Sequence, residues 1–342
     1  MPKITVVITA YNLEAVIAKS LDELFSQTIQ DFNILVVDDC SLDGTRDIVS
    51  QYIERFPERI GGVFLEKNLG KPGLTRNAAL DSGKIDGEYV VFLDGDDSIE
   101  PIYIETLYNM MLEKDTDIAV CAYDRVEIET GHVLCVEMQR FPKVLVLPPD
   151  SGILAYINAS VWNKMIRTAL IGDKRFSDFS VGEDLCFMLQ LYSKCRTIRF
   201  TDQVLAHYQV RSSSIISNTQ LGDIKAFAED IKNFYKESPD SAIKDTVELA
   251  TFIHIGISMA IRANDNPGIF TRQHLSWTRD YFAEHFNLFK GSRFLKFNSL
   301  RHHGVRGLAI WFCLMLYKLH SFGLFLFLYG MFKKITRKDV KF

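Results

Sequence analysis

Apolar and polar residues alternate in two regular ways along the first 130 residues. Short apolar runs rich in β-branched residues predict strands at 4–9, 33–37, 62–65, 89–93 and 116–123. Segments with apolar residues at helical spacing predict helices at 14–26, 45–56, 74–82 and 101–112. Strands that alternate with helices of these lengths form right-handed crossovers. The pattern therefore predicts an α/β fold with a mainly parallel sheet flanked by helices.

The strand predicted at 89–93 ends in a cluster of acids. Asp94, Asp96 and Asp97 follow it within four positions, at the edge of the sheet where open α/β folds bind their ligands. Like charges this close repel each other, and a hard divalent cation such as Mg²⁺ or Mn²⁺ relieves the repulsion. A metal here would hold the phosphates of a nucleotide. The alternative is an acidic turn that caps the helix starting near Pro101.

Polar side chains also follow the first two predicted strands. Thr9, Tyr11 and Asn12 offer a hydroxyl, an aromatic face and an amide that can flank a base. Asp39 can accept a hydrogen bond from a base N–H or from a ribose hydroxyl. Turn chemistry alone explains any one of these loops, but three neighbouring strand ends of this kind predict a site.

A glycine-containing segment, 68–79, leads into the third predicted helix and places Arg76 in its first turn. A cation at a helix N-terminus suits a diphosphate. The segment is neither a P-loop nor a G-x-G-x-x-G fingerprint, which argues against a dehydrogenase.

Four motifs together resemble the GT-A fold glycosyltransferases of family 2. They are Val-Ile-Thr-Ala-Tyr-Asn, Val-Val-Asp-Asp-Cys-Ser-x-Asp-Gly-Thr, Asn-x-Gly followed by Arg-Asn-Ala-Ala, and Phe-Leu-Asp-Gly-Asp-Asp. The resemblance covers about residues 3–215. It implies a Rossmann-like nucleotide-binding sheet and a D-x-D motif at 94–96, with Asp96 a metal ligand and Asp94 nearer the ribose. It also implies that Thr9, Tyr11 and Asp39 contact a uracil, and that Arg76 lies near the base or the phosphate.

The second half of the chain supplies acids for catalysis. Glu183 and Asp184 begin an apolar helical segment, where acids are also favoured by the helix dipole. The pair resembles the family's Glu-Asp motif, which implies that Asp184 is the general base and that Glu183 orients it or the acceptor. Arg211 and Ser214 resemble residues that close over the diphosphate. His207 is a candidate third metal ligand, or a structural hydrogen-bonding residue.

These inferences define an expected site and reaction. The enzyme would be an inverting, metal-dependent glycosyltransferase that moves one sugar from UDP to an acceptor hydroxyl in surface polysaccharide synthesis. The alternatives are a sugar-nucleotide nucleotidyltransferase and a non-catalytic glycan-binding scaffold. The processive Gln-x-x-Arg-Trp motif is absent. The expected nucleotide-binding residues are Thr9, Tyr11, Asn12, Asp39, Arg76, Asp94, Arg211 and Ser214; the expected metal ligands are Asp94, Asp96 and His207.

Domain organisation follows from changes in pattern. We expect a glycosyltransferase domain at 1–217, with a nucleotide-binding half at 1–125 and an acceptor half at 126–217. A helical region at 218–289 and a basic, apolar tail at 290–342 follow. The tail has apolar blocks at 307–317 and 322–332, each too short to span a bilayer. We expect helices that lie at the membrane surface; a strained span and a packed or dimeric helix pair are the alternatives.

Charge and cysteine usage refine the expected location. The whole chain has a net charge of -4, yet from residue 286 onward it carries eleven basic residues and only one acid, Asp339. This asymmetry suggests an anionic partner for the tail, and the partner we expect is a lipid surface that holds a lipid-linked acceptor. Six cysteines without a C-x-x-C pair, and no signal-peptide pattern, indicate the cytoplasm. The expected location is the inner face of the cell membrane.

Overall fold

The computed structural model describes residues 3–148, 152–210, 221–238, 241–265, 271–286 and 292–336. The chain forms two compact units. Unit 1 comprises Met1–Leu147 with Asn158–Ser212, and unit 2 comprises Pro148–Ile157 with Ser213–Phe342. The domain ends expected at 217 and 289 fall outside the described residues, and the expected division into three parts stays a prediction.

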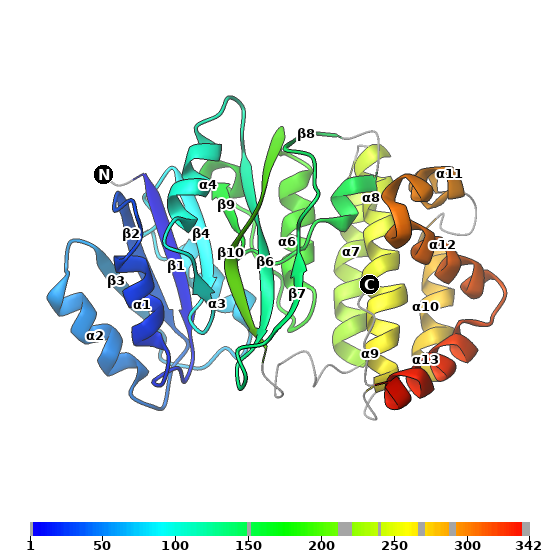
Figure 1. The fold of residues 1–342 in the computed structure, drawn as a ribbon, viewed down its shortest axis with the longest axis horizontal. Helices are drawn as coiled ribbons and strands as arrows, with labels where there is room; N and C mark the ends of the chain where they lie inside the picture. Colours follow the sequence, from blue (N-terminus) through cyan, green and yellow to red (C-terminus); the bar gives the residue numbers. More distant parts are fainter. Residues whose placement is uncertain are drawn as a thin grey trace. The chain divides into compact units, whose positions relative to one another are not determined.

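Unit 1 is built on a ten-stranded mixed sheet (Figure 1). Its strand order is β3-β2-β1-β4-β9-β6-β10-β5, with β7 beside β6 and β8 beside β10. The prediction of an α/β fold with a central sheet flanked by helices is confirmed. The strands are β1 (Ile4–Ala10), β2 (Phe32–Asp38), β3 (Ile60–Phe64), β4 (Tyr89–Asp94), β5 (Ser98–Ile99), β6 (Ile118–Glu127), β7 (Val133–Glu137), β8 (Val144–Val146), β9 (Lys164–Arg167) and β10 (Thr197–Val210).

The helices of unit 1 are α1 (Ile17–Phe25), α2 (Thr45–Arg55), α3 (Pro72–Asp81), α4 (Tyr103–Met111), α5 (Thr168–Ile171) and α6 (Glu183–Tyr192). The first begins three residues after the predicted start at Glu14. The N–H of Glu14 donates to Asp43 Oδ2 at 3.0 Å, and Glu14 Oε2 accepts from the N–H of Gly44 at 3.0 Å. These bonds hold the residues before α1 against the loop after β2 rather than in a helix.

Parallel pairing brings three strand ends to one edge of the sheet. In the register of β1 with β4, Thr9 lies opposite Asp94, and in that of β1 with β2, Ala10 lies opposite Asp38. The interior of these strands is buried on both faces, as their near-continuous apolar runs predict. The core therefore fixes where the polar strand ends meet.

Strand β10 was not predicted as one element because two irregularities interrupt its pattern. Its parallel register with β6 shifts between Thr201 and Val204 and again between Val204 and Ala206. After the shifts, His207 lies opposite Asp124 of β6 and opposite Ser98 of β5. Bulges of this kind re-aim side chains near sites.

Unit 2 is helical in its described residues. Its α-helices are α7 (Leu221–Glu237), α8 (Ser241–Thr251), α9 (Met259–Asp265), α10 (Thr271–His285), α11 (Phe297–Leu300), α12 (Gly304–Lys318) and α13 (Phe322–Thr336). The stretch Ser241–Asn264 is long and apolar enough to cross a membrane, but 78% of its apolar 18-residue segment is buried inside the protein. A helix buried to this extent is typical of a protein core.

A π-helical segment, Phe252–Ser258, joins α8 to α9. Side chains from other helices bind two of its carbonyls. The hydroxyl of Tyr317 donates to Gly256 O at 2.5 Å, and Nε2 of the buried His274 lies 3.2 Å from Ile255 O. Since a carbonyl can only accept, Nε2 of His274 carries the proton. The sequence pattern gave no sign of this segment.

Candidate active site

The ends of β1 and β4 form the centre of the site. The hydroxyl of Thr9 donates to Asp94 Oδ1 at 3.0 Å, and the N–H of Gly95 donates to Thr9 O at 2.9 Å. A Cβ atom built on Gly95 would lie 2.9 Å from that same carbonyl oxygen and 2.9 Å from Leu13 Cδ1. Only glycine lets the acidic loop approach β1 this closely. The expected placement of Thr9 beside Asp94 follows from the register.

Arg76 joins this centre to the acids of the second half. Its Nη2 lies 2.7 Å from Asp94 Oδ1, its Nη1 lies 2.9 Å from Asp184 Oδ1, and Glu183 Oε1 is 4.0 Å away. The Arg76 side chain is only 3% exposed. Burial alone would lower the pKa of Arg76, but the charges of Asp184, Asp94 and Glu183 outweigh it and raise that pKa. The guanidinium therefore stays charged and ties three carboxylates together.

Close packing at the start of α3 puts Arg76 in this position. Pro72 occupies the first turn, where its missing N–H costs nothing. A Cβ atom on Gly73 would lie 2.9 Å from Phe176 Cβ and 3.0 Å from Glu183 Cγ. The glycine lets the first turn of α3 approach the segment that leads into α6.

Glu183 and Asp184 form the first turn of α6, and Gly182 before them adopts a left-handed conformation with φ 87°. Burial and then the charge of Asp184 raise the pKa of Glu183 to about 7. Burial also raises the pKa of Asp184, and Arg76 opposes that rise more than any other neighbour. A carboxylate that is partly held back from ionisation and 20% exposed is suited to accept a proton.

The carboxylates after β4 fit a metal ion. Burial and then the charges of Asp94 and Asp96 raise the pKa of Asp97 well above its usual value. Asp97 Oδ1 accepts from the N–H of Gln209 at 3.0 Å, while its buried Oδ2 has no partner in the structure. A dication would relieve this repulsion. No cluster of three or more metal-ligating side chains occurs among the described residues, so a diphosphate would have to complete the coordination.

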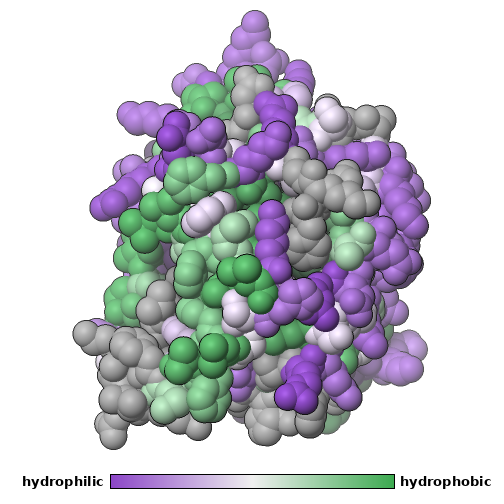
Figure 2. All heavy atoms as spheres, turned by 90° about the vertical axis from the view of Figure 1, so that its right-hand side faces the viewer, coloured by the Kyte–Doolittle hydropathy of each residue, from purple (hydrophilic) through white to green (hydrophobic). Residues whose placement is uncertain are grey.

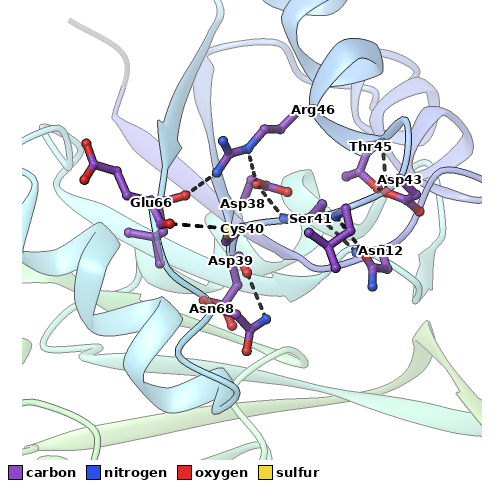
Figure 3. A network of polar contacts seen from close by, with 12 residues as sticks. Asn12, Asp38, Asp39, Cys40, Ser41, Asp43, Thr45, Arg46, Glu66 and Asn68 are labelled. Carbon is purple, nitrogen blue, oxygen red and sulfur yellow. Dashed lines mark hydrogen bonds and ion pairs between the residues drawn. The ribbon is translucent and has the colours of Figure 1, made fainter.

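The loops after β1 and β2 hold each other in place (Figure 3). The N–H of Asn12 donates to Ser41 Oγ at 2.9 Å, and Asn12 Oδ1 accepts from the N–H of Leu42 at 2.8 Å. Asn12 has a positive φ of 52°, a conformation that asparagine tolerates better than most residues. Tyr11 beside it is 44% exposed. The ring of Tyr11, which the sequence predicted could flank a base, is therefore accessible to solvent.

Asp39 is buried, and the loop before α3 occupies its carboxylate. Its Oδ1 accepts from the N–H of Leu69 at 2.7 Å, and its Oδ2 accepts from the N–H of Gly70 at 3.1 Å. The side chain of Asn68 donates to Asp39 O at 2.9 Å (Figure 3). A base could share these oxygens, since each carboxylate oxygen accepts two hydrogen bonds. The uracil contact stays a prediction.

His207 lies between two carboxylates. Its Nδ1 is 2.8 Å from Asp124 Oδ1, and its Nε2 is 3.1 Å from Glu100 Oε1. Both nitrogens are therefore engaged in this structure, which favours the structural alternative over the metal ligand. The metal assignment of His207 stays a prediction. Arg211 and Ser214 lie outside the described residues.

Sequence reasoning missed one group beside Asp184. Lys164 is fully buried at the start of β9, and its charge lowers the pKa of Asp184. In the sequence it stands between Asn163 and the apolar pair Met165 and Ile166, a pattern that does not reveal its burial. The neighbouring Trp162 is buried and stacks on Tyr208, with ring centroids 5.4 Å apart.

Comparisons with known proteins place the chain in a family. Residues 5–149 match Glycosyl transferase family 2. The chain is 31% identical over 223 residues to the putative teichuronic acid biosynthesis glycosyltransferase TuaG of Bacillus subtilis, covering 64% of this chain and 82% of TuaG. The chain belongs to glycosyltransferase family 2, and the predicted class of enzyme is confirmed at the level of the family.

Two further relatives define the extent of the likeness. The chain is 29% identical to glycosyltransferase GlyA of Streptococcus pneumoniae over 62% of its length, and it spans 31% of GlyA. The structure of TarS residues 1–349 of Staphylococcus aureus in complex with UDP-GlcNAc matches with a TM-score of 0.70 at 23% identity, covering 93% of this chain and 92% of that one. This likeness shows a shared fold.

Proposed function

We propose that the protein transfers one sugar from a UDP-sugar to an acceptor hydroxyl with inversion at the anomeric carbon. The observation that carries the proposal is the position of Arg76 between Asp94 and Asp184, at 2.7 Å and 2.9 Å. One cation joins the acid expected at the donor to the acid expected at the acceptor. Such a site can hold both reactants beside each other, which is where much of the rate enhancement of a transferase originates.

In this proposal Asp184 is the general base. Its carboxylate takes the proton of the acceptor hydroxyl while the acceptor oxygen attacks the anomeric carbon and UDP departs from the opposite face. The bond to the acceptor forms as the bond to the diphosphate breaks, and no sugar–enzyme bond is needed. Glu183, 12% exposed and next to the base, orients the acceptor or Asp184 itself.

Asp94 and Asp96 would hold Mn²⁺ or Mg²⁺, which would neutralise charge on the departing diphosphate. Arg76 supplies a fixed positive charge at the same place. Thr9, Tyr11, Asn12 and Asp39 lie in the loops where a uracil would bind. The fold shared with a UDP-GlcNAc complex of TarS supports the choice of a UDP-sugar, and the relative TuaG supports a role in bacterial surface polysaccharide synthesis.

The test combines a donor screen with one substitution. Purified protein is assayed for UDP release from a panel of UDP-sugars, with and without Mn²⁺. Asp184→Asn is expected to reduce turnover by about 10²–10⁴-fold, the usual contribution of a general base, while UDP binding measured by calorimetry stays within about twofold of wild type. Unchanged turnover of Asp184→Asn would reject the assignment of the base.

We also propose that unit 2 binds the surface of an anionic membrane, where a lipid-linked acceptor would be found. Helices α12 and α13 each have one buried and one exposed apolar face. On α13, Leu324, Phe327, Leu328 and Met331 are exposed at helical spacing, with Phe327 at 61%. On α12, Val305, Leu308 and Phe312 repeat the pattern. Figure 2 shows apolar side chains gathered in a patch bordered by hydrophilic ones.

The charged residues around the exposed apolar face of α12 and α13 favour an anionic partner. The described residues 292–336 contain no Asp or Glu. Their exposed basic side chains are Arg293, Lys296, Arg301, Arg306 and Lys318. An exposed apolar stripe on helices whose own charged residues are all basic matches the interface of an anionic bilayer, where each basic residue contributes about 1 kcal/mol. A second copy of the chain would bring positive charge against positive charge.

Vesicle flotation tests this surface. Wild-type protein is expected to float with phosphatidylglycerol vesicles and to remain in solution with phosphatidylcholine vesicles. Phe327→Ser combined with Leu328→Ser is expected to reduce the floated fraction at least about fivefold, since each buried apolar side chain contributes roughly 1.5–3 kcal/mol. Leu112→Ser, a single exposed leucine at the end of α4 in unit 1, is the matched control. Equal flotation of all three proteins, or none by wild type, would reject the membrane surface.

A further inference from the structure

His207 of β10 contacts one acid on each side of its strand. In the register of β10 it lies opposite Asp124 of β6 and opposite Ser98 of β5. Its Nδ1 is 2.8 Å from Asp124 Oδ1, and its Nε2 is 3.1 Å from Oε1 of Glu100, which is two residues beyond Ser98. The ring therefore connects β6 to the residue that directly follows β5.

The bulges of β10 bring His207 to this place. Before them, Ile198 pairs with Ile118 of β6, and a strand that continued in that register would set Val204 opposite Asp124. The two register shifts set His207 there instead. Bulges re-aim side chains near sites, and here the re-aimed side chain is the one that reaches both acids.

The stretch that the ring holds directly follows the acidic loop, residues 94–97, where the metal would bind. The carboxylates of this loop repel each other, so its shape needs support from outside. Strand β5 after it has only two residues, against about 5–6 in an ordinary strand. The N–H of Gln209 donates to Asp97 Oδ1 at 3.0 Å, and the N–H of Glu100 donates to a carbonyl of β10 at 2.9 Å. The contact of His207 with Glu100 carries this attachment across to β6.

The same contact decides what Nε2 of His207 can bind. A ring nitrogen has one in-plane direction, which serves either a hydrogen or a metal. At Nε2 that direction is taken by Glu100 Oε1, at 3.1 Å. A metal bound to this nitrogen would have to displace Glu100, and the link between β6 and the end of the acidic loop would then be lost.

From these contacts we infer that His207 is a positioning residue, which fixes the acidic loop against β6 and β10 and does not itself bind the metal. The inference rests on the proposed binding of a metal and UDP by Asp94 and Asp96. Carboxylates that are already held together lose less freedom when a cation binds them, so the cation binds more tightly. Loss of the His207 contacts should therefore weaken binding of the metal with UDP and leave the choice between metals unchanged.

The first test measures joint binding of Mn²⁺ and UDP by calorimetry. Glu100→Met loses the contact with His207 and is expected to weaken binding about tenfold, a usual effect of removing a group that orients metal ligands from behind. Glu113→Met is the matched control, because Glu113 is an exposed acid that pairs with Arg199 of the same strand β10 at 3.6 Å. It should bind within about twofold of wild type. If His207 were a metal ligand, Glu100→Met would free Nε2, and unchanged or tighter binding would overturn the inference.

The second test asks which metals are affected. His207→Phe keeps a ring and removes both contacts, and it is expected to weaken binding of Mg²⁺ and of Ni²⁺, each with UDP, by the same factor. Imidazole suits Ni²⁺ whereas Mg²⁺ prefers oxygen, so a loss confined to Ni²⁺ would identify a ligand and overturn the inference. Glu100 is 46% exposed, so Glu100→Met keeps the inference testable if His207→Phe does not fold.

Pulsed electron paramagnetic resonance of wild type with Mn²⁺ and UDP is expected to show no coupling to an imidazole nitrogen, and such a coupling would overturn the inference. A merely structural role would lower the Tm of both variants and leave binding equal to wild type once scaled by the folded fraction, which would also overturn it. If wild type binds Mn²⁺ with UDP and Asp96→Asn does not, while Glu100→Met binds as wild type does, only the role of His207 fails. If wild type binds no Mn²⁺ with UDP, the proposed function fails, and the role of His207 with it.

Discussion

Arg76 Nη1 lies 2.9 Å from Asp184 Oδ1, although 108 residues separate the two in sequence. The same guanidinium holds Asp94 through its other terminal nitrogen. One side chain thereby joins the ends of two segments of unit 1 that are far apart in sequence, and its removal would leave three acids without their shared counter-charge.

Arg76→Met should therefore be strongly destabilising. Breaking a buried ion pair by removing one partner costs about 3–5 kcal/mol, and urea unfolding would measure the loss. Arg175→Met is the control, because Arg175 pairs with Asp81 at the surface, with side chains 35% and 62% exposed. Its loss should change the free energy of unfolding by no more than about 1 kcal/mol. Equal effects of the two substitutions would contradict the central position of Arg76.

Glu183→Gln should change how stability depends on pH. The pKa of Glu183 is raised from 4.5 to about 7 in the folded state. Between these values the folded protein holds a proton that the unfolded chain has lost, so stability falls as pH rises and levels off above pH 7. The glutamine variant lacks this fall. Relative to wild type it should gain on the order of 1–3 kcal/mol between pH 4.5 and 8, measured by urea unfolding across that range.

A control for this prediction is Glu58→Gln, because Glu58 is exposed at the surface. As a surface substitution it should leave the free energy of unfolding within about 0.5 kcal/mol of wild type. A difference between Glu183→Gln and wild type that does not change with pH would show that Glu183 does not hold a proton in the folded protein.

Gly95→Ala should disturb the acidic loop. The new methyl would lie 2.9 Å from Thr9 O, closer than real contacts allow, and overpacking of this kind costs about 1–3 kcal/mol. We expect weaker UDP binding by calorimetry together with reduced stability. Gly61→Ala on β3 is matched to it, since nothing lies within 4 Å of its added Cβ. UDP affinity of Gly95→Ala equal to that of Gly61→Ala would disprove the need for close approach.

Metal removal gives a fourth prediction. EDTA should abolish transfer, and Mn²⁺ or Mg²⁺ should restore it. With UDP and Mn²⁺ at about 100 times their joint dissociation constant, the folded state should gain about 2.7 kcal/mol, visible as a rise in Tm. Asp96→Asn should lose most of this rise, whereas UDP alone should stabilise both proteins to a similar, smaller extent. Full activity in EDTA would exclude the metal.

The sheet of unit 1 could be predicted because apolar runs report burial directly. Val90 and Val91 of β4 are fully buried, and the strand ends where Asp94 interrupts the run. The same logic placed Thr9 and Asp94 at one edge, which the register bears out. Strand β10 escaped prediction because its bulges break the alternation on which strand assignment rests.

Contacts between distant segments could not be predicted from periodicity. Arg76 was expected near a diphosphate because it was placed in the first turn of a predicted helix, but nothing local shows that it also reaches Asp184. Lys164 directly follows Asn163, and sequence alone does not show that carbonyls of its own loop surround its ammonium. Such partners are set by tertiary packing.

The π-helical segment in unit 2 fixes the rotational phase of everything that follows it. A π-helical turn, with i→i+5 bonds, holds about one more residue than an α-helical turn, so deleting one residue from Phe252–Ser258 would restore ordinary helical bonding and remove the wide turn. The carbonyls that Tyr317 and His274 bind from outside would then move, and those two bonds oppose the change. Single-residue insertions and deletions should be tolerated in unit 2 loops far better than here.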